Sequence, residues 1–331
     1  MTLLPNMFII VSFKRLKEAD MDLKNKKIVL TGASGFLGYH VKMNLLKNGV
    51  FDIFTPPSQI CDLRDRKVCG LVIRGDIVIH VAGFVGGIGL NKEKPYTLWH
   101  DNSLMGLNVL DAAIKNNVSK VVIIGTICEY PKFTPVPFRE DDLHNGYPEE
   151  TNAPYGYAKK SLLVGGNAAR MEFGTNVIHL LPVNLYGPGD HFEPEKSHVI
   201  PALIKKVADA KILNHDRLEL WGTGTASREF LYVEDAAEAI VLATENYDGA
   251  EPVNIGAGFE ITIRELSHKI CKIMDFGGSI EWDHTKPDGQ PRRCLDVSRA
   301  EREFGFKAKT DFDEGLRKTI DWYLSQVQKT A

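Results

Sequence analysis

Three polar side chains in one stretch of the chain are suited to proton transfer at a carbonyl group. Tyr155 and Lys159 form a Tyr-x-x-x-Lys motif, and residues four apart share one face of a helix. A neighbouring ammonium favours a phenolate, so we expect Lys159 to lower the pKa of Tyr155 from about 10. The Thr126 hydroxyl would hold the same carbonyl oxygen. The set suits hydride transfer, whereas for an isolated Tyr-x-x-x-Lys motif an exposed helical turn is the favoured interpretation.

The elements around this set predict its position in a fold. The apolar run over 118–125 predicts a strand that brings Thr126 and Cys128 to its carboxyl end. Open parallel sheets bind ligands at that edge. Residues 131–154 are rich in Pro, Glu and Asp without periodicity, which predicts a loop long enough to be functional. The helix that carries Tyr155 and Lys159 should extend to about Phe173.

A glycine-rich turn follows the first predicted strand, over 27–31. Gly32, Gly35 and Gly38 precede a helical pattern that ends at Asn48-Gly49. Glycines at this spacing permit a tight turn, a close approach to a pyrophosphate and close helix–strand packing. The helix N-terminus would supply N–H groups to the phosphates. We therefore predict a dinucleotide-binding turn.

The end of the second predicted strand, over 51–54, should select the cofactor. An acidic residue there binds the ribose of NAD, and an Arg accepts the 2′-phosphate of NADP. The chain has Thr55-Pro56-Pro57-Ser58, which provides neither. Asp62 and Leu63 follow, at a point suited to contact with an adenine. The sequence leaves the choice between NAD and NADP open.

A third buried strand is predicted over 76–81 and leads to Ala82-Gly83, whose small size lets a cofactor lie across the strand end. We interpret His80, within this apolar run, as a core histidine. Residues 84–89 form a glycine-rich loop that either closes over a substrate or only connects elements. A long helix should follow from about 95 to 117.

Composition is that of a globular protein. The chain has 331 residues, 44% hydrophobic and 25% charged, and its net charge of −3 gives no sign of nucleic-acid or anionic-membrane binding. Five cysteines without a C-x-x-C pair argue against a disulfide framework and against a zinc site, and favour the cytoplasm. No metal site is predicted.

The first residues form an apolar run over 3–13, followed by basic residues. The run is too short to span a bilayer and lacks signal-peptide features. We interpret residues 1–20 as an extension, from an upstream start codon or, less favoured, as a membrane-surface anchor.

The alternation of strands and helices predicts an α/β fold: a Rossmann-type doubly wound parallel sheet with a smaller α/β substrate-binding region. We assign residues 1–25 to the N-terminal extension and 26–185 to the NAD(P)-binding domain. Residues 186–331 form mainly the substrate-binding region, with some segments returning to the first domain. Helices are expected over 199–210, 262–274 and 312–326, with a short strand over 253–256.

Several segments carry a specific resemblance to known enzymes. They are Asn184-Leu-Tyr-Gly-Pro-Gly-Asp-His-Phe, Ser197-His-Val-Ile-Pro-Ala-Leu, Trp221-Gly-Thr-Gly-Thr-Ala-Ser-Arg-Glu-Phe-Leu, Val253-Asn-Ile-Gly and Lys286-Pro-Asp-Gly-Gln-Pro-Arg. With the glycine turn, the Thr126/Tyr155/Lys159 set and Pro182-Val183-Asn184, they resemble the extended short-chain dehydrogenase/reductases. Within that superfamily the chain from about Lys26 resembles the GDP-L-fucose synthases.

The resemblance implies a GDP-4-keto-6-deoxy-mannose 3,5-epimerase/4-reductase that uses NADP(H), with NAD(H) as the alternative. It implies Cys128 as base and His198 as acid for inversion at C3 and C5, followed by reduction at C4 with Tyr155 as proton donor. A keto group acidifies the neighbouring carbons, and a thiol can ionise in an electropositive site. The alternatives are that Cys128 is an inert cysteine and that His198 is a surface residue without a catalytic role.

The expected site residues fall into three groups. Catalysis is assigned to Thr126, Cys128, Tyr155, Lys159 and His198. Cofactor binding is assigned to Gly32, Ser34, Gly35, Phe36, Leu37, Gly38, Asp62, Leu63, Ala82, Gly83, Tyr155, Lys159, Pro182, Asn184, Leu185 and His198. Substrate binding is assigned to Asn184, Val199, Leu203, Lys206, Trp221, Arg228 and Asp288. For Trp221, a place in the protein core is an alternative of nearly equal weight.

Departures from the family's usual pattern leave other activities open. Thr126 replaces Ser and keeps the hydroxyl, Lys206 replaces Arg, and Pro56 and Pro57 replace the expected basic residues. The alternatives are a C4-reductase or an epimerase acting on another GDP-4-keto sugar, such as a heptose, and an inactive NAD(P)-binding scaffold. The resemblance also implies a homodimer through the two long helices, and neither nucleic acid nor a membrane is an expected partner.

Overall fold

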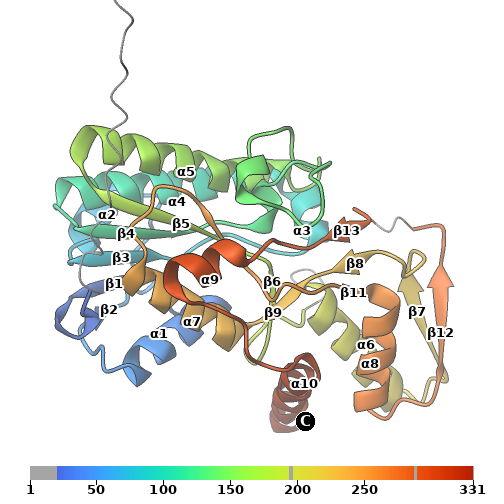
Figure 1. Ribbon diagram of the computed structural model, residues 1–331. Helices are drawn as coiled ribbons and strands as arrows, with labels where there is room; N and C mark the ends of the chain where they lie inside the picture. Colours follow the sequence, from blue (N-terminus) through green and yellow to red (C-terminus); the bar gives the residue numbers. More distant parts are fainter. Residues whose placement is uncertain (1–20, 194–196, 287–288, 331) are drawn as a thin grey trace, which may run out of the picture.

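The computed structural model describes residues 21–193, 197–286 and 289–330, and a six-stranded parallel sheet lies at its centre (Figure 1). The strand order is β10-β5-β4-β3-β1-β2. The strands are β1 (Ile28–Thr31), β2 (Ile53–Phe54), β3 (Ile77–His80), β4 (Lys120–Ile124), β5 (Asn176–Pro182) and β10 (Val253–Ile255). This arrangement confirms the predicted Rossmann-type sheet. Its last strand, β10, comes from a segment well beyond residue 185 and pairs in parallel with β5.

Helices cover both faces of this sheet. One face carries α2 (Arg66–Val72), α4 (Pro95–Lys115) and α5 (Ala153–Phe173), and the other carries α1 (Phe36–Lys47), α7 (Val233–Asn246) and α9 (Ser298–Phe304) (Figure 1). Successive strand residues point to opposite faces, so Val29 packs in the cluster beneath α4, whereas Ile28 and Leu30 pack in the cluster on the other side. Because both faces are buried, these strands are apolar throughout.

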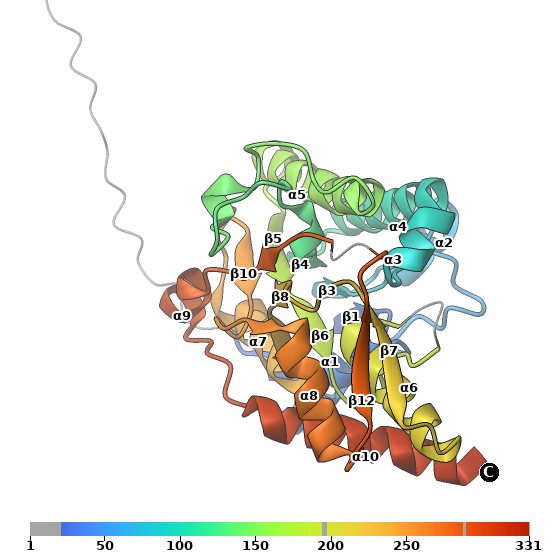
Figure 2. The same cartoon turned by 90° about the vertical axis from the view of Figure 1, so that its right-hand side faces the viewer.

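A second lobe lies beyond the carboxyl edge of the sheet. It contains α6 (Val199–Ile212), β7 (Arg217–Trp221), β8 (Ser227–Arg228), β11 (Ile261–Thr262), α8 (Ile263–Ile273), β12 (Ser279–Asp283), β13 (Arg292–Arg293) and α10 (Phe312–Thr330). Figure 2 shows β12 and β7, which pair in parallel, side by side between α8 and α6. A parallel pair, β6 (Asn184–Tyr186) with β9 (Phe230–Tyr232), links the lobe to the first domain.

The remaining elements are short. They are α3 (Ile88–Glu93) and three single turns of 3₁₀ helix, η1 (Leu23–Asn25), η2 (Ile127–Glu129) and η3 (Glu140–Asp142). The predicted glycine loop over 84–89 is therefore shorter than expected, because α3 begins at Ile88. Leu23 is buried, and the Met21 N–H donates to the Glu245 carbonyl at 3.2 Å. Residues 21–25 thus pack on the core, which differs from the predicted boundary at residue 25; residues 1–20 lie outside the described part.

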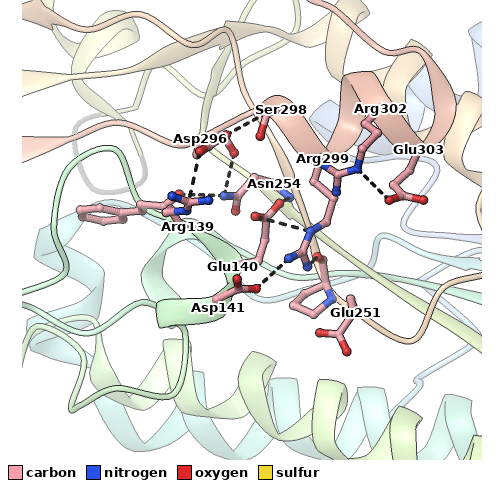
Figure 3. A network of polar contacts seen from close by, with 12 residues as sticks. Arg139, Glu140, Asp141, Glu251, Asn254, Asp296, Ser298, Arg299, Arg302 and Glu303 are labelled. Carbon is pink, nitrogen blue, oxygen red and sulfur yellow. Dashed lines mark hydrogen bonds and ion pairs between the residues drawn. The ribbon is translucent and has the colours of Figure 1, made fainter. Parts of the chain in front are cut away.

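The segment between η2 and α5 is held by a polar network around Asn254 (Figure 3). The Asn254 N–H donates to the Glu140 carboxylate at 3.0 Å, and its side-chain amide donates to the carbonyls of Phe138 and Asp296 at 2.9 and 3.0 Å. Arg299 of α9 reaches Glu140 at 3.7 Å. Phe138 also forms a parallel bridge with Leu295. The network therefore ties this loop to β10 and to the segment that follows β13.

Candidate active site

A tight turn at the end of β4 carries two of the predicted catalytic side chains. Thr126 caps η2, and its hydroxyl accepts a hydrogen bond from the Cys128 N–H at 3.2 Å. The hydroxyl groups of Thr126 and Tyr155 are hydrogen-bonded to each other. A Cβ placed on Gly156 would lie 2.3 Å from the Cys128 carbonyl oxygen, so α5 packs directly on this turn. Thr126, Cys128 and Tyr155 are thus brought together at the carboxyl edge of the sheet.

Lys159 lies one turn further along α5 and is buried. Its Nζ donates to the Ile124 carbonyl at 3.0 Å, and a Cβ on Gly83 would lie 3.5 Å from it. Burial lowers the pKa of Lys159 to about 8, and the nearby Glu129 carboxylate opposes that fall. The amine is therefore largely an ammonium at neutral pH, yet close to the range in which it loses its proton.

The expected effect of Lys159 on Tyr155 is wrong. Burial raises the pKa of Tyr155, and the proximity of Cys128 and Glu129 raises it further, while the hydrogen bond with Thr126 acts in the opposite direction. The physical reason is that Lys159 Nζ points to the Ile124 carbonyl and the phenol lies among groups that disfavour a second negative charge. Tyr155 is thus a protonated phenol, which is the form that donates a proton to a carbonyl oxygen.

A guanidinium from the second lobe lies next to the thiol of Cys128. Arg293 Nη1 is 3.9 Å from Cys128 Sγ, and Arg293 Nε donates to Gln290 Oε1 at 2.6 Å. A cation at this distance stabilises a thiolate, the form that accepts a proton. The sequence analysis missed Arg293, since nothing in the local pattern connects β13 with a turn that lies 165 residues earlier.

A buried carboxylate and imidazole lie directly beneath the same turn. Glu129 is fully buried, and both of its carboxylate oxygens are 3.1 Å from His179 Nε2 of β5. Its Oε1 accepts a hydrogen bond from the Thr126 N–H at 2.9 Å. The sequence analysis missed this pair too, although Thr126-x-x-Glu129 has the spacing of a capping box.

The glycine turn between β1 and α1 fits a bound pyrophosphate. Gly32 has φ of +73°, and a Cβ on Gly38 would lie 2.0 Å from the Gly32 carbonyl oxygen, so a larger residue at 38 is excluded. Ser34 and Gly35 are exposed at the N-terminus of α1. Helix N–H groups there are open to an anion. Phe36 and Leu37 open the same helix.

The remaining predicted cofactor residues lie along the carboxyl edge. Ala82 and Gly83 follow β3, Pro182 ends β5, and Asn184 and Leu185 begin β6. The histidine in β3, His80, is buried and hydrogen-bonded through Nδ1 to Thr31 Oγ1 at 2.9 Å, which confirms a core role.

The predicted adenine contact is occupied in part by an ion pair. Asp62 is exposed and pairs with Arg64 at 2.8 Å, while Arg64 also reaches Asp101 of α4 at 2.9 Å. Leu63 is buried beside them. The Arg64 hydrogen bonds hold the pKa of the Asp62 carboxyl below its usual range. A basic residue, Arg64, therefore does lie near this end of the site, although Pro56 and Pro57 replace the basic residues expected after the second strand.

His198 lies at the N-terminus of α6, next to the loop that follows β3. A Cβ on Gly87 would lie 2.6 Å from the Ser197 carbonyl oxygen, so only a glycine permits this approach. Partial desolvation and the proximity of His191 lower the pKa of His198, although its side chain still reaches solvent. Within the described ranges, no hydrogen bond or ion pair joins His198 to the group around Tyr155.

The predicted substrate residues lie on the second lobe. Lys206 Nζ donates to the Glu219 carbonyl at 2.9 Å, and Arg228 ends β8. Trp221 is 63% exposed, which overturns the alternative of a core tryptophan, and Lys286 Nζ lies 5.8 Å from its ring centroid. Of the two expected lining residues of α6, Val199 is exposed, whereas Leu203 packs in the core of this lobe. Asp288 lies outside the described residues.

The described part of the chain holds neither a cluster of metal ligands nor a membrane-spanning helix. No group of three or more His, Cys, Asp or Glu side chains could hold a metal ion there. Among the same residues, no helix is long and apolar enough to cross a bilayer.

Comparisons with known proteins agree with this geometry. The profile of the NAD dependent epimerase/dehydratase family matches residues 28–256. The chain is 37% identical over 308 residues to a "Probable GDP-L-fucose synthase 1" of Oryza sativa subsp. japonica, covering 92% of this chain and 94% of that one. It superposes on a GDP-6-OMe-4-keto-L-xylo-heptose reductase from Campylobacter jejuni (TM-score 0.86, 26% identity, 93% and 99% covered). A GDP-L-fucose synthetase from Naegleria fowleri bound to NADP gives a TM-score of 0.81 (28% identity, 91% and 94% covered).

Proposed function

The chain belongs to the NAD dependent epimerase/dehydratase family, and we propose that it is an NADP(H)-dependent enzyme that converts a GDP-4-keto-6-deoxy-mannose substrate to GDP-L-fucose. The observation that carries the proposal is that Tyr155 of α5 lies against the turn that carries Thr126 and Cys128, with Arg293 beside the thiol. A reductase needs only Tyr155 and Thr126 of these side chains. The Cys128 thiol, with the Arg293 guanidinium beside it, provides the base that inversion next to a keto group requires.

Inversion would begin with proton removal at C3 or C5, where the C4 keto group stabilises the enolate. The Cys128 sulfur accepts the proton as a thiolate, since the Arg293 guanidinium lies 3.9 Å away. His198 returns a proton to the opposite face. Once the thiol has released its proton to solvent and the imidazole has taken one up, the same cycle at the second carbon inverts that centre too.

Reduction would follow at C4. When bound, the dinucleotide cofactor supplies the hydride, and the turn over 32–38 and the edge residues Ala82 and Gly83 would hold it. Tyr155 donates its proton to the C4 oxygen, and Thr126 holds that oxygen in place. The Lys159 ammonium, held by the Ile124 carbonyl beside Gly83, would contact the bound cofactor. NADP(H) is proposed over NAD(H), because the Naegleria relative is bound to NADP.

The GDP group would bind on the second lobe. The guanidinium of Arg228 is suited to two oxygens of the diphosphate. Exposed Trp221 would offer a face to the base or sugar, and Lys206, Val199 and Asn184 are the further proposed contacts of the substrate.

A second candidate is C4 reduction of a GDP-4-keto-heptose. The observation that favours it is the TM-score of 0.86 with a reductase of that substrate class. This candidate uses the Tyr155 group alone and needs no base at C3 or C5.

The test is incubation of the enzyme with GDP-4-keto-6-deoxy-mannose in heavy water, once with NADPH and once with NADH. We expect a product that carries deuterium at C3 and C5, formed with oxidation of NADPH. Reduced product without deuterium would instead support a C4-reductase. Absence of turnover with either cofactor, with turnover of a GDP-4-keto-heptose, would replace the first candidate by the second.

The proposal includes a homodimer in the cytoplasm. Apolar side chains are exposed along the two long helices, among them Trp99 and Leu107 of α4 and Val164 and Met171 of α5. A dimer that pairs these helices would cover them. Light scattering should give twice the chain mass, and Val164→Glu should give a monomer. All five cysteines are free thiols, which supports a reducing compartment.

A further inference from the structure

Glu129 and His179 are buried polar residues that the proposed reaction does not use. Their exposed fractions are 0% and 2%, and the two side chains join η2 to β5 beneath the catalytic turn. A Cβ on Gly125 would lie 2.3 Å from Glu129 Oε1 and 2.4 Å from His179 Nε2. The backbone of Gly125 therefore closes directly over the pair, between Ile124, which binds Lys159, and Thr126.

The hydrogen bonds indicate which ring nitrogen of His179 carries a proton. His179 Nε2 faces both carboxylate oxygens at 3.1 Å, while Nδ1 is buried and has no partner within the described part of the chain. A proton on Nδ1 would be a buried N–H donor without an acceptor, which is costly. The geometry therefore places the ring proton on Nε2, where it is donated to the Glu129 carboxylate.

A capping role alone does not account for this carboxylate. Glu129 completes a capping box with Thr126 by accepting the Thr126 N–H at 2.9 Å. A glutamine serves that role equally well. A glutamine would not, however, supply a negative charge near Lys159. Burial disfavours the Lys159 ammonium, and the Glu129 carboxylate favours it.

We propose that Glu129 and His179 are a positioning pair for the reduction: His179 orients the carboxylate, and the carboxylate holds the Thr126 turn and places a negative charge at Gly125, next to the Ile124 carbonyl that binds Lys159. The inference rests on the proposed function for the reaction that it serves. The titratable groups that face the carboxylate or the ammonium are Tyr130, His144, Tyr155, Lys160, His179 and His80.

The experiment follows the Lys159 side chain by NMR in lysine-labelled full-length enzyme with NADP bound, with the signal assigned by Lys159→Arg. Glu129→Gln keeps the acceptor for Thr126 and removes the charge. We expect its Lys159 titration to move about one pH unit lower. His179→Gln keeps a hydrogen-bond donor and leaves the Glu129 carboxylate in place, so the titration of Lys159 in this variant should stay near that of the wild type. Glu281→Gln, at an exposed carboxylate of β12, is the matched control.

In the reduction assay, the pH above which the rate declines should also move about one unit lower in Glu129→Gln. It should not move in His179→Gln or in Glu281→Gln. An unshifted Lys159 titration in folded Glu129→Gln would overturn the inference. Should that variant fail to fold, the ¹⁵N chemical shifts of His179 in the wild-type enzyme provide the test. An imidazolium at neutral pH would overturn the inference. Lack of turnover by the wild type would defeat the proposed function, whereas the NMR titration would still decide the role of the pair.

Discussion

Gly156 should be required for activity, because it lets α5 pack on the turn that carries Cys128. A Cβ at this position would lie 2.3 Å from the Cys128 carbonyl oxygen and 3.0 Å from its carbon. Ordinary contact begins at 3.4 Å, so Gly156→Ala must move the turn and α5 apart by 3.4 − 2.3, or about 1.1 Å. A misplacement of about 1 Å in an active site can cost about 100-fold in rate. This corresponds to about 2.7 kcal/mol in the barrier.

The expected result for Gly156→Ala is thus a fall of about 100-fold in kcat/KM for reduction, measured by NADPH oxidation. Alanine favours a helix by about 1 kcal/mol over glycine, which offsets part of the strain in the folded state. Gly165→Ala is the control in the same helix, because its Cβ would meet only Leu110 at 3.6 Å. It should keep full activity and raise the unfolding temperature. A Gly156→Ala enzyme with wild-type kcat/KM would refute the argument from packing.

Four further outcomes are expected. Tyr155→Phe should lower C4 reduction by at least about 100-fold, as loss of a general acid does, with NADPH binding retained in a fluorescence titration. Cys128→Ser should abolish deuterium incorporation at C3 and C5 while an already inverted keto sugar is still reduced; persistent wash-in would remove Cys128 from the role of base. Arg293→Met should slow the same exchange by about 10-fold or more, and Arg293→Lys should restore part of it, because a cation stabilises the thiolate. Reduction should decline as the pH rises through about 8, where Lys159 loses its proton, and a profile that is flat from pH 7 to 9 would contradict this.

The parts of the fold that sequence predicted well depend on local spacing. The glycine turn over 32–38 and the Tyr155/Lys159 pair each lie within one element or one turn, so their periodicity is sufficient. The strands of the sheet were found because both faces are buried and the segments are apolar throughout. Their ends shifted by one or two residues, since strand pairing, rather than composition, decides where each strand stops.

The parts that sequence did not predict join distant segments. Arg293 meets Cys128, and His179 meets Glu129, only after the sheet and the second lobe are assembled. The pKa of Tyr155 was predicted in the wrong direction for a related reason. Spacing along a helix places Lys159 on the same face as Tyr155, but it predicts neither the burial of the phenol nor the direction in which Lys159 Nζ points. The capping-box spacing from Thr126 to Glu129 was the one local signal available for the buried pair.

The Asn254 network also bears on the order in which the protein becomes functional during synthesis. The ribosome releases the glycine turn, the catalytic turn and α5 early. The sheet nevertheless lacks its edge strand until residues 253–255 emerge, and the loop before α5 lacks Asp296 and Arg299 until later still. A nascent chain that ends before β13 also lacks the guanidinium that faces Cys128. In a partly made chain the proposed base is therefore not yet assembled, and the Cys128 thiol gains its neighbouring cation only when nearly the whole polypeptide has been translated.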